Sequence, residues 1–113
     1  VVHGAAGGIG THAIQVAKAF GAGRVIAVVS TEEKGKVAMG VGADEFVLAD
    51  GFREAVGQSV DIVVDPVGGD RFTDSLRTLK AHGRLLVIGF TAGEIPTVKV
   101  NRLLLNNVSV VAV

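Results

Sequence analysis

The chain has 113 residues, of which 49% are hydrophobic, and its 11 basic residues balance its 11 acidic ones. This length suits one domain, the even charge argues against a domain that binds nucleic acid or a membrane surface, and the absence of cysteine excludes disulfides and thiolate metal sites. No apolar run reaches the roughly 18 residues of a membrane span and no signal-peptide pattern begins the chain, so we expect a soluble, cytoplasmic protein.

A short strand and a helix are the first predicted elements. Only Val1 to His3 precede the first glycine, so we expect a piece of a longer protein that starts inside its first strand. From Gly8 to Phe20 apolar residues recur at helical spacing, and Gly21 follows as a stop signal.

The next predicted pair is a buried strand and a helix. Residues 24–29 form a nearly continuous run of apolar, mostly β-branched residues, which suits a strand covered on both faces of a parallel sheet. Ser30 to Glu33 reads as a capping box, with Ser30 as N-cap and Glu33 at the third helical position. We expect the helix to run to about Val41.

The rest of the chain continues this alternation. The further predicted strands are residues 45–48, 60–65, 84–88 and 108–113. The predicted helices are residues 52–58, a helix capped by Asp70 and ended by Gly83 with Phe72, Leu76 and Leu79 buried, and a short helix from Asn101. In the last of these we expect Arg102 and residues 103–105 to make a helix and core.

Strands that alternate with helices predict an α/β fold with a parallel sheet and right-handed crossovers. Six strands fit the Rossmann-type doubly wound order 3-2-1-4-5-6, here with a truncated first strand. We find no solenoid repeat and no linker, so one domain is expected to fill residues 1–113.

The glycine-rich segment Gly4 to Gly10 lies where a phosphate-binding turn occurs, after the first strand and at the start of the first helix. Gly7 allows backbone to approach a pyrophosphate, and Gly10 allows the helix to pack against the strand. The N–H groups of Gly8 and Ile9 are expected to face the anion at the positive end of the helix dipole. A tight turn without a ligand is the alternative.

The end of the second strand predicts which dinucleotide binds. An NAD site would place a carboxylate there for the ribose hydroxyls, whereas this chain has Ser30 and Thr31, with Lys34 in the next helical turn. Hydroxyls and an ammonium group suit a 2′-phosphate, which favours NADP(H) over NAD(H). Glu32 and Glu33 would oppose a phosphate if they turned toward it.

Five motifs together resemble the cofactor domain of the zinc-independent quinone oxidoreductases in the medium-chain dehydrogenase/reductase superfamily: residues 4–10, 42–44, 65–70, 83–90 and 101–105. The resemblance covers essentially the whole chain. It implies hydride transfer from NADPH to a quinone or another α,β-unsaturated carbonyl, with a catalytic GroES-like domain outside this chain. The alternatives are an enoyl-thioester reductase of the same superfamily and a non-catalytic NADPH-binding sensor module.

The resemblance also assigns residues to parts of the cofactor. It implies that Ala6 to Ile9 hold the pyrophosphate, that Ser30, Thr31 and Lys34 hold the 2′-phosphate, and that Val67 and Gly89, Phe90 and Thr91 flank the nicotinamide. One departure is Ala49, which stands where the family often has a tyrosine at the adenosine end.

Four residues that resemble catalytic or metal-binding groups have structural explanations. His3 reads as a core or edge residue, His12 as a surface or interdomain residue, and His82 as a cation beside a helix-ending glycine. We expect the carboxylate of Asp65 to bond the backbone of residues 66–69. The sequence therefore predicts neither a catalytic residue nor a metal site in this chain.

The last strand, residues 108–113, is apolar on both faces and would lie at an edge of the sheet. An unprotected edge of this kind pairs readily with another chain. In the resembling family this strand joins two subunits, which implies a homodimer.

Overall fold

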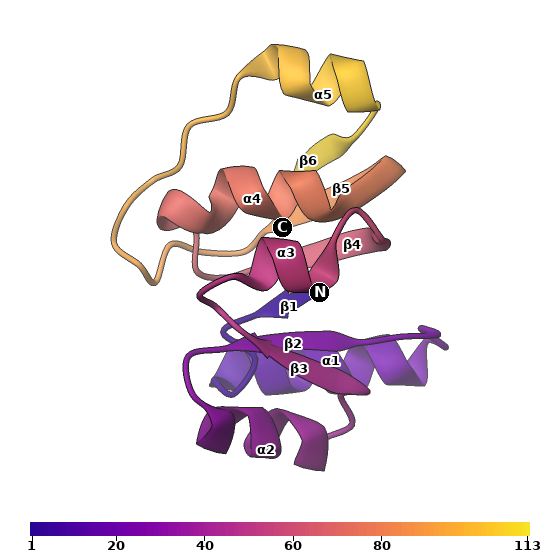
Figure 1. Cartoon of the computed structure of the whole chain (residues 1–113), viewed down its shortest axis with the longest axis vertical. Helices are drawn as coiled ribbons and strands as arrows, with labels where there is room; N and C mark the ends of the chain where they lie inside the picture. Colours follow the sequence, from indigo (N-terminus) through magenta and orange to yellow (C-terminus); the bar gives the residue numbers. More distant parts are fainter. The chain divides into compact units, whose positions relative to one another are not determined.

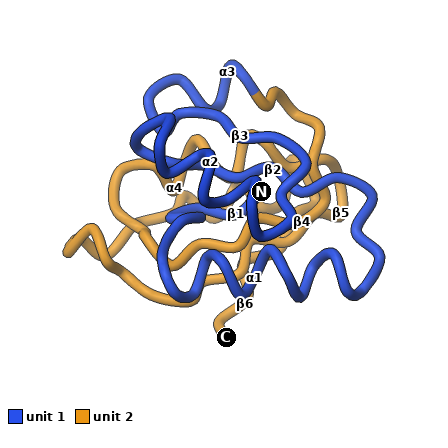
Figure 2. The backbone as a smooth tube through the Cα atoms, turned by 90° about the horizontal axis from the view of Figure 1, so that it is seen from below, with its two compact units in different colours: residues 1–55 blue, residues 56–113 orange.

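The computed structural model describes all 113 residues. They divide into two compact units, Val1–Ala55 (unit 1) and Val56–Val113 (unit 2), which Figure 2 shows in different colours. No helix is both long enough and apolar enough to cross a membrane.

Unit 1 contains three parallel strands. Its elements are β1 (Val2–His3), α1 (Gly8–Ala19), β2 (Ile26–Val29), α2 (Glu32–Gly40), β3 (Glu45–Leu48) and α3 (Phe52–Val56), whose last residue is the first of unit 2 (Figure 1). β2 pairs with β1 on one side and with β3 on the other. Every residue of β2 is buried, as predicted for a strand covered on both faces. The predicted third helix is shorter than expected, because α3 ends at Val56 rather than at residue 58.

The two longer helices of unit 1 each bury only two residues, Gly10 and Ile14 in α1 and Gly35 and Ala38 in α2. Gly35 of α2 is buried, and a β-carbon there would overlap the ring of Phe46 on β3, so only glycine allows this close approach. In α1 the fully buried side chain is Ile14. Val16 and Phe20, which belong to the apolar repeat that predicted this helix, are 52% and 88% exposed. The helix is confirmed, but this part of its apolar repeat faces solvent.

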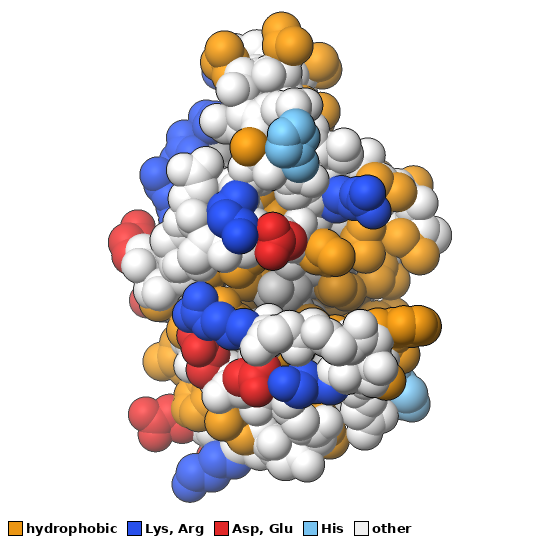
Figure 3. Space-filling view, turned by 90° about the vertical axis from the view of Figure 1, so that its right-hand side faces the viewer, with side chains coloured by type: hydrophobic (Ala, Val, Ile, Leu, Met, Phe, Trp, Pro, Cys, Tyr) orange, Lys and Arg blue, Asp and Glu red, His pale blue; other side chains and the backbone are white.

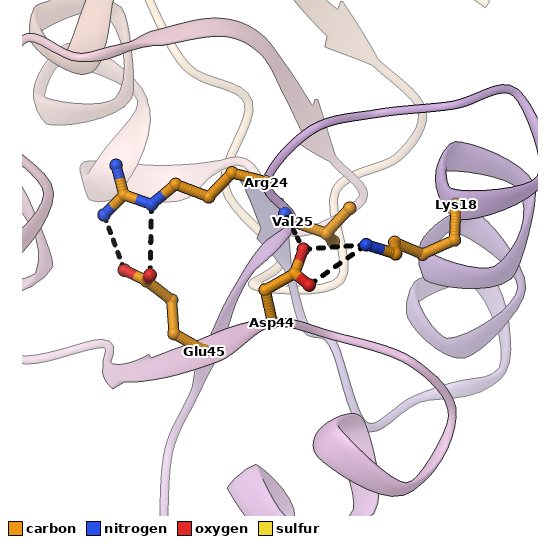
Figure 4. Close-up of polar contacts among 5 residues, drawn as sticks. All are labelled: Lys18, Arg24, Val25, Asp44 and Glu45. Atoms are coloured by element: carbon orange, nitrogen blue, oxygen red, sulfur yellow. Dashed lines mark hydrogen bonds and ion pairs between the residues drawn. The ribbon is translucent and has the colours of Figure 1, made fainter.

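Two ion pairs lie at the amino ends of β2 and β3, one joining α1 to Asp44 before β3 and one joining Arg24 before β2 to Glu45 of β3 (Figure 4). The Asp44 carboxylate accepts the N–H of Val25 at 2.7 Å and bonds from Lys18 Nζ at 3.0 and 3.1 Å. Arg24 donates to Glu45 at 2.6 and 3.0 Å. The backbone bond from Val25, and then Lys18, lowers the pKa of Asp44, and the bond from Arg24 lowers the pKa of Glu45. Because these groups lie at the ends of the strands opposite to the predicted cofactor site, their role is structural.

These contacts predict that the free energy of unfolding decreases as the pH falls. Since the folded-state pKa of Asp44 is lowered, its stabilising effect is complete above the ordinary carboxyl range and is lost as the pH falls below about 4. Asp44→Asn should therefore be less stable than the wild type at pH 7, and the difference should shrink toward pH 3. Urea unfolding across this range measures it, with the exposed Asp50→Asn as control. A deficit that stayed constant with pH would contradict this assignment.

Unit 2 contains the other three strands. Its elements are β4 (Val60–Asp65), the 3₁₀ helix η1 (Gly69–Arg71), α4 (Phe72–Thr78), β5 (Leu79–Val87), α5 (Val100–Asn106) and β6 (Ser109–Ala112). β5 pairs in parallel with β4 and with β6. The sixth predicted strand is confirmed by β6, and the fourth by β4, which has the predicted bounds.

The predicted helix from Asp70 to Gly83 is wrong at both ends. Asp70 lies in η1 and makes no capping bond, and α4 ends at Thr78. Leu79 is buried as expected, but it begins β5, and Gly83 lies inside that strand. The register jumps between Val60 and Ile62 of β4, so the chain bulges before it resumes pairing at Arg84. A β-carbon at Gly83 would lie 2.8 Å from the Lys80 carbonyl oxygen. Glycine is therefore needed at this position because the chain turns tightly, and not because a helix ends there.

The leucines near the end of the chain do not make a core. α5 confirms the short helix predicted from Asn101, but none of its residues is buried. Leu104 and Leu105 are 81% and 78% exposed. Figure 3 shows hydrophobic side chains at the top of the view, where α5 lies. The predicted contribution of residues 103–105 to the core is therefore wrong.

The strand order of the six-stranded sheet is β3-β2-β1-β4-β5-β6. The chain thus has the predicted α/β fold, with helices between parallel strands and the Rossmann-type order. In such a sheet the carboxyl ends of the strands carry the ligand-binding turns. The segments that follow β1, β2, β4 and β5 are therefore the expected positions of a ligand site.

Candidate functional site

The turn between β1 and α1 is tight because glycine occupies both of its ends. Gly4 has φ +57° and Gly7 donates its N–H to the Gly4 carbonyl at 3.0 Å. A β-carbon at Gly7 would lie 3.3 Å from that carbonyl oxygen. A β-carbon at Gly10 would overlap the same oxygen and lie 2.7 Å from Cα of Ala5. Gly10 therefore allows α1 to pack closely on the turn that follows β1.

The amino end of α1 has no side-chain cap. Its N-cap is Gly7, and its first turn contains no acidic residue. The polar side chains of that turn bond carbonyls instead: Thr11 Oγ1 donates to Gly7 at 2.9 Å, and His12 Nδ1 donates to Gly8 at 2.6 Å. No side-chain oxygen therefore accepts from the N–H groups of Gly8 and Ile9, which are left for solvent or for an anion.

The predicted 2′-phosphate group lies at the start of α2. Thr31 is the N-cap, since it has extended φ and ψ and its Oγ1 accepts the Lys34 N–H at 3.2 Å. The prediction of Ser30 as N-cap is therefore wrong by one residue, and Glu33 is at the second helical position. The side chains of Ser30 and Lys34 are exposed, as are those of Glu32 and Glu33. Hydroxyl, ammonium and carboxylate groups thus share this helix end.

Unit 1 brings the two predicted cofactor segments to one edge of its sheet. β1 and β2 are parallel neighbours, with Val2 opposite Ala27 and His3 opposite Val28. Their carboxyl ends lead directly into the glycine turn and into α2, respectively. The Ala5 N–H donates to the Val28 carbonyl at 3.3 Å, which extends the pairing into the turn.

Unit 2 brings together the two segments predicted to flank the nicotinamide. The turn after β4 and the turn after β5 are joined by backbone bonds, in which Thr91 N–H donates to Pro66 at 3.1 Å and Ala92 N–H donates to Val67 at 3.0 Å. In the opposite direction, Gly69 N–H donates to Glu94 at 3.1 Å. We call residues 65–69 and 88–94 the paired turns.

The Asp65 carboxylate fixes the first of the paired turns from inside. Asp65 is 1% exposed, and its Oδ1 accepts the N–H groups of Val67 and Gly68, both at 2.9 Å. This confirms the predicted structural role of Asp65. Gly68 has φ +68° and ψ −140°, and a β-carbon there would lie 3.1 Å from Cδ1 of Phe90. The Phe90 ring thus rests on Gly68 and remains 43% exposed.

The sequence did not predict that Gly68 contacts Phe90. It also did not predict that the carbonyl of Glu94 accepts the N–H of Gly69. The Gly68-Gly69 pair after a buried strand was a signal for an unusual backbone conformation. The contacts of this pair with Phe90 and Glu94 could not be predicted from the local sequence. They depend on the parallel pairing of β4 with β5.

The three histidines lie apart from any catalytic arrangement. His3 is fully buried and contacts Phe52 edge-on, with 4.9 Å between ring centroids, so the core interpretation is confirmed. His12 is exposed on α1, as predicted. His82 is not at a helix end: it lies in the bulge of β5 with φ +69°, and its N–H donates to the Asn107 carbonyl at 2.8 Å. No three His, Asp or Glu side chains gather as a metal site would require.

Comparison with known proteins gives consistent matches over nearly the whole chain. The family profile described as zinc-binding dehydrogenase matches residues 8–113. Quinone oxidoreductase-like protein 2 of Rattus norvegicus is 43% identical over 96% of this chain and 33% of its own length. Acryloyl-coenzyme A reductase of Metallosphaera sedula is 43% identical over 79% of this chain and 26% of its own length.

Among solved structures, the quinone oxidoreductase of Escherichia coli complexed with NADPH matches with a TM-score of 0.87 and 31% identity. The match covers 99% of this chain and 36% of that protein. The chain therefore spans between 26% and 36% of the length of these three relatives.

Proposed function

The chain belongs to the zinc-binding dehydrogenase family of the medium-chain dehydrogenase/reductase superfamily, and we propose that it is the NADPH-binding domain of a reductase that acts on a quinone or another α,β-unsaturated carbonyl. The observation that carries this proposal is the uncapped amino end of α1 behind its glycine turn. The chain's residues do not fit the zinc in the family's name, since they form no ligand cluster, and the proposed role of this chain involves no metal.

The diphosphate of the cofactor would bind at the start of α1. Gly7 would allow a close approach of the backbone, with Ala6 beside it in the turn, and the N–H groups of Gly8 and Ile9 would donate to phosphate oxygens. The helix dipole adds a favourable field, and no carboxylate in the first turn opposes it.

The 2′-phosphate would bind beside the start of α2. Ser30 and Thr31 offer hydroxyl donors and Lys34 an ammonium group, while no carboxylate stands at the end of β2 to accept ribose hydroxyls. Glu32 and Glu33 would have to remain turned toward solvent. Preference for NADPH over NADH therefore depends on Lys34 outweighing these two neighbours.

Lys34→Ala tests this preference. Loss of one exposed ammonium–phosphate contact should weaken NADPH binding by about 1 to 2 kcal/mol, which is roughly 5- to 30-fold, and leave NADH nearly unchanged. Isothermal calorimetry with both dinucleotides measures the difference, and Lys36→Ala, also exposed on α2, is the matched control. Equal losses for NADPH and NADH would show that Lys34 does not contact the 2′-phosphate.

The nicotinamide end would lie against the paired turns, beside Val67 and residues 89–91. When bound, NADPH supplies the hydride that reduces the acceptor. The role of this chain is to hold the ring in place, because hydride transfer depends on alignment of the donor and acceptor carbons. We therefore propose no catalytic residue within these 113 residues.

The rest of the catalytic site would come from a GroES-like domain outside this chain, since the chain spans a third of its relatives' length. The isolated 113 residues are then expected to bind NADPH weakly and to show no reductase activity. Reductase activity from the isolated chain would contradict this division. NADPH binding without turnover in the whole protein would support a sensor instead.

Enoyl-thioester reduction is the second candidate, favoured by the similarity to an acryloyl-coenzyme A reductase. Both reactions use the same cofactor and an acceptor in which a double bond is conjugated to a carbonyl. Turnover of the whole protein with a simple quinone and with an enoyl-coenzyme A, compared by kcat/KM, decides between them.

The last strand suggests a homodimer. β6 is the outermost strand and lies beside β5. Its apolar residue Val111 is 38% exposed, and Val113, which follows the strand, is 79% exposed. Pairing of two β6 strands would cover this edge. Light scattering of the whole protein at high micromolar concentration should show a dimer, and a strict monomer would refute the proposal.

A further inference from the structure

The paired turns depend on one buried carboxylate. Asp65 is the last residue of β4, and its side chain turns back over its own strand end, so that Oδ1 accepts the N–H groups of Val67 and Gly68 at 2.9 Å each. These two donors would otherwise lack partners in a buried turn, since Gly68 is itself buried. Removal of the acceptor would thus release the turn rather than merely weaken it.

The same contact determines which groups of the turn face outward. With the N–H groups of residues 67 and 68 directed at Asp65, the side chain of Val67 remains only partly buried. Gly68, which has a φ of +68°, carries no β-carbon, and this leaves the space in which the Phe90 ring rests. Ile88 N–H donates to the Asp65 carbonyl at 3.0 Å, so Asp65 is tied to both paired turns at once.

We propose that Asp65 is a positioning residue for the nicotinamide end of the cofactor: it does not contact the cofactor, but holds Val67 and Phe90 in the arrangement against which the ring binds. This inference rests on the proposed function. It assigns Asp65 no proton transfer, because the side chain is 1% exposed and its carboxylate is directed at the backbone of its own turn.

Three substitutions in the whole protein separate this role from a general effect on folding. Asp65→Ala removes the acceptor. Asp65→Asn keeps an oxygen that can accept both N–H bonds but removes the charge. Asp61→Asn is the matched control, an aspartate of the same strand whose side chain is 78% exposed and pairs with Lys80. If the alanine variant does not fold, Asp65→Ser, whose hydroxyl accepts such bonds more weakly, replaces it.

Two readouts distinguish the ends of the cofactor. Steady-state kinetics and the emission of bound NADPH report on the nicotinamide, whereas competitive inhibition by adenosine 2′,5′-bisphosphate, which lacks the nicotinamide, reports on the adenosine end. Asp65→Ala is expected to lower kcat by about 10- to 100-fold and to alter the emission of bound NADPH, because a small displacement of the ring disturbs hydride transfer. Asp65→Ser should lose about 3- to 10-fold in kcat. The inhibition constant of the bisphosphate should stay within about twofold, and Asp65→Asn should stay within about threefold of the wild-type kcat.

Unchanged kcat in the alanine or serine variant would overturn the inference, as would an asparagine variant impaired as strongly as alanine. An equal loss of affinity for NADPH and for the bisphosphate would also overturn it, since that indicates general disruption. These outcomes presuppose an active wild type. A wild type that neither binds nor oxidises NADPH would instead refute the proposed function.

Discussion

Gly10→Ala is expected to lower the free energy of unfolding by about 3 kcal/mol and to weaken NADPH binding by about tenfold or more. The added β-carbon would overlap the Gly4 carbonyl oxygen and lie 2.7 Å from Cα of Ala5. Both neighbours are backbone atoms held by the β1–β2 pairing, so the helix itself must move away from the strand. That movement displaces the N–H groups proposed to bind the diphosphate.

Urea unfolding and calorimetry with NADPH measure the two effects of Gly10→Ala. Gly40→Ala is the control, because Gly40 is also helical and a β-carbon there meets nothing within 4 Å. The control should be neutral or stabilising by up to about 1 kcal/mol. A Gly10→Ala protein as stable as the control would show that the close contact between α1 and the first turn is not present in solution.

Gly68→Ala is expected to lower the free energy of unfolding by about 2 to 3 kcal/mol. Its φ of +68° with ψ −140° lies in a region that residues other than glycine occupy only with strain, at a cost of about 1–3 kcal/mol. The new β-carbon would also press on Phe90 at 3.1 Å. Urea unfolding measures the total cost, and altered emission of bound NADPH would report a displaced nicotinamide ring.

Two further variants separate strain from contact at Gly68. Gly93 also has a left-handed φ, +83°, but a β-carbon there meets nothing within 4 Å, so Gly93→Ala should cost only about 1 kcal/mol. Adding Phe90→Ala to Gly68→Ala should recover part of the loss, because it removes the crowded ring. If both alanine variants lost the same free energy of unfolding, and Phe90→Ala restored none of it in Gly68→Ala, the contact between Phe90 and Gly68 would be contradicted.

Local pattern was sufficient where one physical signal dominated. The run of residues 25–29 favoured a strand buried on both faces, since it is apolar throughout and mostly β-branched. The glycine turn before α1 was recognisable because tight backbone approach leaves few alternatives to glycine. Asp65 followed by Pro66 and two glycines likewise indicated a carboxylate that bonds its own turn.

Prediction from the sequence failed where a segment could form either a helix or a strand, and where the outcome depends on contacts with residues distant in the chain. Residues 79–83 could continue the helix by their periodicity, but pairing of Leu79 with Val60 in the sheet prevails. Ser30 and Thr31 are both preferred capping residues, and only the backbone geometry selects Thr31. Leu104 and Leu105 suggested a core because apolar residues are usually buried, whereas in this chain α5 exposes them.

The central claim is that the free amide groups at the start of α1 bind the diphosphate of NADPH. A crystal structure of the protein grown or soaked with saturating NADPH tests it most directly. We expect phosphate oxygens about 2.7–3.2 Å from the backbone nitrogens of Gly8 and Ile9, with the 2′-phosphate beside Ser30 and Lys34. Nucleotide bound elsewhere, or no nucleotide at this helix end under those conditions, would contradict the account.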